Sequence, residues 1–141
     1  MTLYAESSAV LAWLLGEPSA VALRGTLGRA RLVTTSALTL LECQRTLARA
    51  ASSGRAAYEE ASAARALLTG AAPHWIVADI DGAVLARAGE PFPLEPIRTL
   101  DAIHLATALL ARTTLPDLAV LSLDRRVRDC ALRLGFRVLP Q

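Results

Sequence analysis

The sequence has few cysteines, few aromatic residues and no lysine. Of its 141 residues, 2 are cysteines and 4% are aromatic. Two thiols, Cys43 and Cys130, cannot form the disulfide framework of a small secreted protein. Neither lies in a CxxC motif or a Cys/His cluster of the kind that holds zinc. We therefore expect both cysteines to be reduced and buried. The scattered aromatic residues argue against a base-stacking platform for single-stranded nucleic acid.

The charge balance does not indicate a general polyanion binder. All 15 basic residues are arginine, and they nearly cancel 13 acids, which leaves a formal net charge of +2. An arginine-only set suits bidentate recognition of phosphate. A biased coding composition is the favoured explanation, although the sequence alone does not separate the two.

Long hydrophobic runs and targeting signals are also missing. The first residues, MTLYAE, contain no basic segment and reach an acid at Glu6, so they do not resemble a secretory signal. The apolar stretch at residues 9–15 is far shorter than the roughly 20 residues that span a membrane. We expect a cytoplasmic protein with one domain at residues 1–141. A hydrophobic content of 53% with 20% charged residues excludes a mainly disordered chain.

Alternating apolar runs and helical patterns predict an α/β fold. Each predicted strand is apolar on both faces, which is typical of a parallel sheet covered by helices on both sides. We therefore expect a three-layer α/β/α domain with a mostly parallel sheet of four to five strands. The predicted strands are residues 3–5, 32–35, 75–78, 118–121 and 136–139, and the predicted helices are residues 8–15, 19–28, 37–51, 55–69, 82–88, 99–111 and 125–134.

Helix-capping residues mark several of these boundaries. Ser7 or Ser8 is expected to cap the first helix, and Ser36 the helix that follows the second strand. Asp124 is a candidate cap for the last helix, which Gly135 closes. Three prolines make residues 90–96 a loop.

Four acidic residues stand where a carboxylate is unexpected. Glu6 follows the first predicted strand and Asp124 the fourth, and ligands of parallel sheets gather beyond the carboxyl ends of strands. Glu42 and Asp101 interrupt apolar runs within helices. A buried charge costs several kcal/mol unless it is paired or binds a metal. Four converging carboxylates would bind a hard divalent ion, Mg²⁺ or Mn²⁺.

Ordinary structural roles also account for three of these acids. Glu42 has the helical spacing of an ion-paired surface stripe with Arg45 and Arg49. Asp101 can cap its helix or pair with Arg98, and Asp124 can act as a helix cap alone. Spacing by itself therefore leaves the metal site a hypothesis.

Three segments resemble the PIN-domain family, specifically the VapC-type toxins. They are residues 3–10 (LYAESSAV), residues 99–108 (TLDAIHLATA) and residues 120–126 (VLSLDRR), the last followed by GFRV at residues 135–138. The string around Asp101 is the most specific, and together the segments extend over nearly the whole chain.

The resemblance implies a Rossmann-like, PIN-like sheet and Mg²⁺- or Mn²⁺-dependent cleavage of RNA by the toxin of a toxin–antitoxin pair. It further implies a small cognate antitoxin protein and a homodimer. The family usually has Asp where this chain has Glu6, and a site displaced by about 1 Å can cost on the order of 10²-fold in rate. Carried over by position, the catalytic and metal-binding set is Glu6, Glu42, Asp101 and Asp124, with Ser122 as the hydroxyl that orients a carboxylate or the substrate.

In the implied mechanism, one or two metal ions activate water for in-line attack on the scissile phosphate. Glu42 completes the metal shell or accepts the proton of the water. Arg125 and Arg126 either contact backbone phosphates or form a solvated first helical turn. His104 either hydrogen-bonds Asp101 or is a satisfied residue of the helix face.

Two rival functions remain open. A catalytically weakened PIN-like module, spoiled by Glu6, would bind a partner protein or RNA. A phosphatase or nucleotide-binding protein has less support, because the chain contains neither GxGxxG nor GxxxxGK[ST]. The apolar helices at residues 9–15 and 37–47 are candidates for a groove that takes an amphipathic antitoxin segment.

Overall fold

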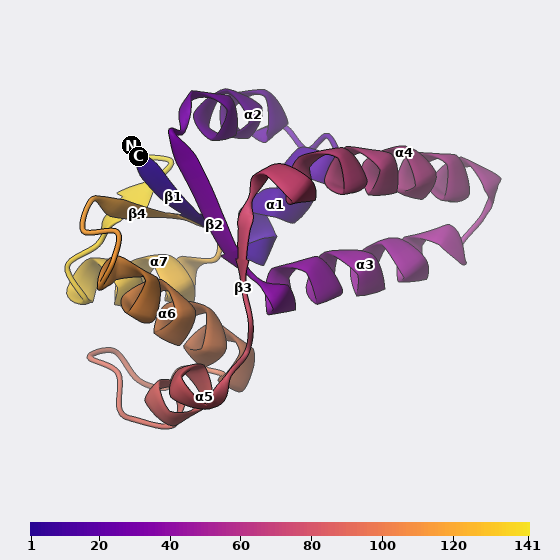
Figure 1. The fold of residues 1–141 in the computed structure, drawn as a ribbon. Coiled ribbons are helices and arrows are strands. Elements are labelled where there is room, and N and C mark those ends of the chain that lie inside the picture. The colour runs from indigo at the N-terminus through magenta and orange to yellow at the C-terminus, as the bar shows by residue number, and fades with distance from the viewer.

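The computed structural model describes the backbone of residues 1–141 and every side chain except those at positions 55 and 56. A single parallel sheet forms its centre, with the strand order β3-β2-β1-β4-β5 (Figure 1). The prediction of a three-layer α/β fold with a parallel sheet is confirmed. The strands are β1 (Thr2–Ala5), β2 (Leu32–Ser36), β3 (Ile76–Ala78), β4 (Leu118–Leu121) and β5 (Arg137–Leu139).

Seven α-helices and one 3₁₀ turn surround the sheet. The first four α-helices contribute the core on one face, and α6 and α7 pack on the other, where Tyr4 and Val120 point (Figure 1). The elements are α1 (Ser7–Leu14), α2 (Ala20–Arg29), α3 (Ala37–Ala51), α4 (Arg55–Ala71), η1 (Ala72–His74), α5 (Gly82–Ala88), α6 (Thr99–Arg112) and α7 (Arg125–Arg133).

The central strands are buried on both faces, as their apolar sequence requires. All four residues of β1 and of β4 are buried. Side chains alternate between the faces of a strand, so Tyr4 enters the α6–α7 core while Leu3 and Ala5 enter the opposite core. Strand β1 pairs with β2 on one side and with β4 on the other. The chain order therefore reverses at β1, the place where open parallel sheets bind ligands.

The predicted caps are confirmed at two helices and wrong at one. Ser36 accepts a hydrogen bond from Leu38 N at the start of α3, and Asp124 caps α7. The N-cap of α1 is Glu6 rather than a serine. Ser7 and Ser8 already lie in the first turn, and their hydroxyls donate back to the Glu6 carboxylate.

The predicted end of α7 at Gly135 and the predicted burial of both cysteines are confirmed. Gly135 has φ 81°, the left-handed conformation that ends α7. Cys43 and Cys130 are free and buried. Within the described part of the chain, every helix is too short or too polar to cross a membrane.

Candidate active site

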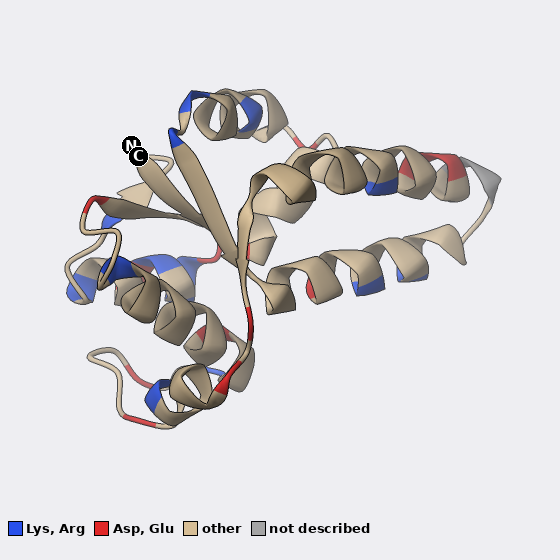
Figure 2. Ribbon diagram, in the orientation of Figure 1, with Lys and Arg blue, Asp and Glu red and all other residues tan. Residues whose placement is uncertain are grey.

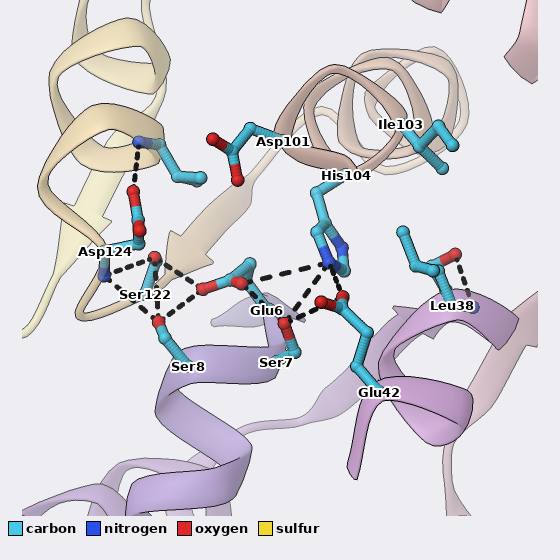
Figure 3. A network of polar contacts seen from close by, with 12 residues as sticks. Glu6, Ser7, Ser8, Leu38, Glu42, Asp101, Ile103, His104, Ser122 and Asp124 are labelled. Atoms are coloured by element: carbon cyan, nitrogen blue, oxygen red, sulfur yellow. Dashed lines mark hydrogen bonds and ion pairs between the residues drawn. The ribbon is translucent and has the colours of Figure 1, made fainter. Parts of the chain in front are cut away.

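The Glu6 carboxylate lies at the corner between β1 and α1. Its backbone N–H donates to Leu121 O across the sheet, and the residue is only 3% exposed. Three serine hydroxyls donate to the carboxylate: Ser7 Oγ and Ser122 Oγ at 2.7 Å each, and Ser8 Oγ (Figure 3). These hydrogen bonds hold a buried charge that would otherwise be costly.

The same serines tie Glu6 to Asp124 beyond the end of β4. Asp124 N donates to Ser8 Oγ at 3.0 Å and to Ser122 Oγ at 3.1 Å. Asp124 Oδ1 in turn accepts from Val127 N at 3.0 Å and caps α7. The carboxyl ends of β1 and β4 are thus joined by hydroxyls, and Ser122 lies against the carboxylate of Glu6.

A buried histidine connects Glu42 to the sheet. His104 of α6 is 2% exposed, and its Nδ1 lies 2.9 Å from Tyr4 Oη and its Nε2 2.7 Å from Glu42 Oε1. Burial, followed by the charge of Glu6, raises the pKa of Tyr4 well above its usual value, so the phenol stays protonated. The ionised Glu42 carboxylate, whose pKa is lowered, can only accept, so Nε2–H donates to it, and in the neutral imidazole Nδ1 then accepts from the phenol. The option of a bond from His104 to Asp101 is wrong: the two ring nitrogens of His104 contact Tyr4 and Glu42, and Asp101 pairs with Arg98.

Glu42 carries its negative charge at neutral pH. Burial by itself raises its pKa, but hydrogen bonds from His104 and Ser7 and the charge of Arg98 outweigh burial and lower the pKa below 4.5. Ser7 Oγ lies 2.7 Å from Glu6 Oε1 and 3.0 Å from Glu42 Oε1, so one hydroxyl spans both carboxylates.

The alternative of an ion-paired stripe on α3 is not what the structure shows. Among the side chains it describes, neither Arg45 nor Arg49 forms an ion pair with Glu42. The partners of Glu42 are His104 and Ser7.

Arg98 links the remaining two acids. Its Nε lies 2.9 Å from Asp101 Oδ2, and its Nη2 lies 3.3 Å from Asp124 Oδ2. Asp101 lies in the first turn of α6 and is 7% exposed, and Arg98, not Asp101, is the N-cap residue. The pairing alternative for Asp101 is therefore confirmed and the capping alternative is wrong. A pocket of about 250 Å³ opens beside this contact, lined by Glu42, Arg98, Thr99, Leu100 and Asp101.

One continuous network of hydrogen bonds and ion pairs therefore connects all four predicted acids, with Arg98 joining Asp101 to Asp124. Figure 3 shows the part of it that joins Glu42, Glu6 and Asp124. It is not a closed ligand cage: in the described part of the chain, no three His, Cys, Asp or Glu side chains are grouped to hold a metal ion. The donor chemistry fits a hard divalent ion at Asp101 and Asp124, since these carboxylates already share a cationic group. The assignment of all four acids as ligands stays a prediction.

Arg125, a predicted phosphate contact, lies outside this network. Arg125 is 94% exposed at its side chain, and its contact is an ion pair with Asp129 at 3.8 Å. Basic and acidic positions are mixed over both helical layers in Figure 2, in keeping with the small net charge.

Tyr4, Ser7 and Ser8 belong to the network, although the sequence does not predict them there. Two serines directly after Glu6 are the available signal, but their position favours a helix-capping role. No local pattern marks Tyr4, because its partner lies 100 residues away.

Comparison with known proteins agrees with this fold. The PIN domain family model matches residues 3–132. Ribonuclease VapC46 of Mycobacterium tuberculosis is 37% identical over 137 residues, which cover 97% of this chain and 95% of that protein. The crystal structure of VapBC2 from Rickettsia felis bound to a promoter DNA fragment superposes with a TM-score of 0.63 at 11% identity, covering 98% of this chain and 97% of that chain. At that identity the structural likeness supports the fold alone. The family match and the VapC relative show that this chain belongs to the PIN-domain family and is a VapC-type protein.

Proposed function

We propose that this chain is a divalent-metal-dependent endoribonuclease that acts as the toxin of a toxin–antitoxin pair. The observation that carries the proposal is the connected network of Glu6, Glu42, Asp101 and Asp124 beyond the carboxyl ends of β1 and β4. The 37% identity to a ribonuclease over nearly the whole chain supports the same chemistry. An RNA target would place the activity in the cytoplasm.

Asp101 and Asp124 would hold Mg²⁺ or Mn²⁺, with Glu6 and Glu42 as direct or water-mediated ligands. When bound, the ion supplies Lewis acidity toward the scissile phosphate and lowers the pKa of the attacking water. The contribution of the protein is to hold the carboxylates in place. Ser122 fixes the carboxylate of Glu6, while His104 fixes that of Glu42.

Glu42 is the group best placed to accept a proton from water. Its carboxylate is half-buried, ionised at neutral pH, and faces the pocket beside Arg98. A general base must be unprotonated and within hydrogen-bond reach of its water. His104 holds one carboxylate oxygen, Oε1, and leaves Oε2 for that water.

The test is cleavage of RNA in the presence of Mg²⁺ or Mn²⁺. Asp101→Asn removes one negative charge from the proposed ion site, so we expect at least about 10²-fold slower cleavage than the wild type. Asp117→Asn makes the same chemical change at the opposite end of β4 and should cleave normally. Equal rates for Asp101→Asn and the wild type would contradict the proposal.

A second candidate is a PIN-like module that binds RNA or a partner protein without cutting. Two observations favour it: three hydroxyls engage the Glu6 carboxylate, and Arg98 stands between Asp101 and Asp124. Glu6→Asp tests it, because the shorter acid is usual in the family. Faster cleavage by this variant would identify Glu6 as the handicap. Absence of cleavage in both proteins, with partner binding retained, would favour the module.

An antitoxin segment has a candidate groove between α1, α3 and the start of α6. Its volume is about 370 Å³, and apolar side chains of Leu11, Leu38, Leu41 and Leu100 line it. Leu41 is 53% exposed and Leu100 is 47% exposed, so an amphipathic helix could cover them. A homodimer is part of the same proposal. Sedimentation of the purified chain tests the homodimer, and binding of a co-encoded small protein tests the antitoxin partner. A chain that stays monomeric and binds no such protein would contradict both proposals.

A further inference from the structure

Arg98 occupies a position that is unfavourable for an arginine. It is the N-cap of α6, and Asp124 is the N-cap of α7, so its guanidinium lies beside the N-termini of two helices. The helix dipole makes both ends positive and disfavours a cation there. Arg98 is held by carboxylates alone: all its hydrogen bonds in the described structure go to Asp101 and Asp124.

Those two carboxylates are the same pair whose chemistry fits a divalent cation. Each of them presents its Oδ2 atom to Arg98. Hard divalent ions bind carboxylate oxygen at about 2.0–2.6 Å, which would place two positive charges directly against the guanidinium. A metal ion bound to both Oδ2 atoms and an intact Arg98 bridge are therefore incompatible.

We infer that Arg98 is a built-in competitor of the divalent metal: the pair Asp101 and Asp124 holds either the guanidinium or the ion. The inference rests on the proposed metal dependence of this site. In the metal-free protein Arg98 neutralises two nearby carboxylates. Metal binding releases it, and the coupling is reciprocal, so removal of Arg98 must strengthen metal binding.

The surroundings of Arg98 permit this exchange. Its side chain is 60% exposed, and it lines the 250 Å³ pocket next to Glu42 and Leu100. The guanidinium can therefore leave the acids without opening the core. Asp101 and Asp124 keep their places, because the first turn of α6 and the cap of α7 fix them.

The experiment is a Mn²⁺ titration followed by thermal unfolding of the full chain. A ligand that binds the folded state raises the melting temperature according to its dissociation constant, so each titration gives an apparent Mn²⁺ affinity. Arg98→Gln should bind Mn²⁺ on the order of tenfold more tightly than the wild type. In EDTA the same variant should melt at a lower temperature, because Asp101 and Asp124 then face each other without a counter-charge.

Two further variants make the result specific. Arg125→Gln removes the same charge next to Asp124, but Arg125 contacts Asp129 and neither of the two acids. Its Mn²⁺ affinity should stay within about twofold of the wild type. Arg98→Lys keeps the charge without the planar fork, so its affinity should fall between those of the wild type and Arg98→Gln. It also serves as the test if Arg98→Gln does not fold.

Unchanged or weaker Mn²⁺ binding by Arg98→Gln would overturn the inference. So would equal tightening in Arg125→Gln, which would reduce the effect to net charge, or no Mn²⁺ stabilisation in any variant. RNA cleavage separates this inference from the proposed function. Tighter Mn²⁺ binding without any cleavage would support Arg98 as competitor and refute the nuclease. Metal-dependent cleavage with an unchanged affinity in Arg98→Gln would refute the competitor alone.

Discussion

The ionised carboxylate of Glu42 makes a pH-dependent contribution to stability. Burial opposes the charge, but His104 and Ser7 overcome it and hold the pKa below the ordinary 4.5. A depressed pKa in the folded state stabilises the protein above the unfolded value, and this contribution is lost as the pH falls through 4.5 toward the folded pKa. We expect the free energy of unfolding to fall more steeply with acidification in the wild type than in Glu42→Gln.

Urea unfolding from about pH 6 to about pH 3 measures this difference. Glu60→Gln, a change at an exposed position of α4, controls for the loss of a charge and should keep the wild-type slope. Parallel pH profiles for the wild type and Glu42→Gln would show that Glu42 has no depressed pKa.

The phenol of Tyr4 is the hydrogen-bond partner of the buried His104 Nδ1. Tyr4→Phe removes the buried donor to Nδ1 and leaves that nitrogen without a partner, which costs about 1–3 kcal/mol. The other tyrosine, Tyr58, is 58% exposed and is the matched control. Its change to Phe should alter the unfolding free energy by less than about 0.5 kcal/mol. Equal losses of unfolding free energy in Tyr4→Phe and Tyr58→Phe, measured by urea unfolding, would show that the Tyr4–His104 hydrogen bond does not stabilise the protein.

At this scale the sequence predicts which acids lie in the network better than it predicts their partners. Glu6 and Asp101 are conspicuous because each interrupts or follows an apolar run. Their partners depend on how α6 packs against β1, and no local pattern encodes a contact between Tyr4 and His104. Capping is the commonest role of serine at a helix start, so the sequence favours that role for the serines after Glu6. In the structure both hydroxyls donate to the Glu6 carboxylate instead.

Helix α7 depends on Asp124 for a role that is separate from the acidic site. Asp124→Asn keeps a good N-cap but removes the charge, whereas Asp124→Ala removes both. We expect urea unfolding to show a loss of about 1 kcal/mol in the alanine variant and much less in the asparagine variant. RNA cleavage should be lost in both.

The N-cap of α5 gives the control for this pair. Asp81 accepts a hydrogen bond from Val84 N at 3.0 Å, as Asp124 does from Val127 N. Asp81→Ala should therefore destabilise the protein by a similar amount and leave cleavage intact. Cleavage of RNA by Asp124→Asn at the wild-type rate would show that the proposed site does not need the charge of Asp124.

The elements themselves were largely predictable. The predicted strand 118–121 coincides with β4, and the predicted helix 82–88 coincides with α5. Both stand between strong turn signals, which fix their ends. Two predicted boundaries differ by one residue, because a polar residue continues the strand. Strand β1 begins at Thr2, which pairs with Leu32, and β2 extends to Ser36, which pairs with Ala78.

The turn between α3 and α4 lies at the far end of a helical pair that extends away from the sheet (Figure 1). Residues 52–54 are exposed, and none of them belongs to the network. Because loop closure costs only about 0.6 kcal/mol for each doubling of loop length, a short Gly-Ser insertion after Ser53 should lower the melting temperature by only a few degrees. Cleavage of RNA should persist.

The matched insertion lies after Leu123, between β4 and α7. It displaces Asp124 from the end of β4 and so breaks the hydrogen bonds that its N–H donates to Ser8 Oγ at 3.0 Å and to Ser122 Oγ at 3.1 Å. This variant should lose cleavage. If both insertions behave alike in melting and cleavage assays, the corner beyond β4 is not needed for the site.

Sheet order is the part of the whole molecule that could not be worked out from local patterns. Five apolar strands permit many parallel arrangements, and the resemblance to PIN domains was needed to favour a Rossmann-like one. The observed order places β1 between β2 and β4. That position brings Glu6 between Glu42 from the early part of the chain and Asp101 and Asp124 from the later part.

The central position of β1 also orders events during synthesis. A ribosome makes Glu6 and Glu42 before it makes β4 and Asp124. Until β4 inserts beside β1, Ser122 cannot reach Glu6, so the growing chain lacks the complete network of acids and hydroxyls. A nascent chain that lacks β4 therefore lacks the proposed catalytic site, whatever its earlier helices and strands have already formed.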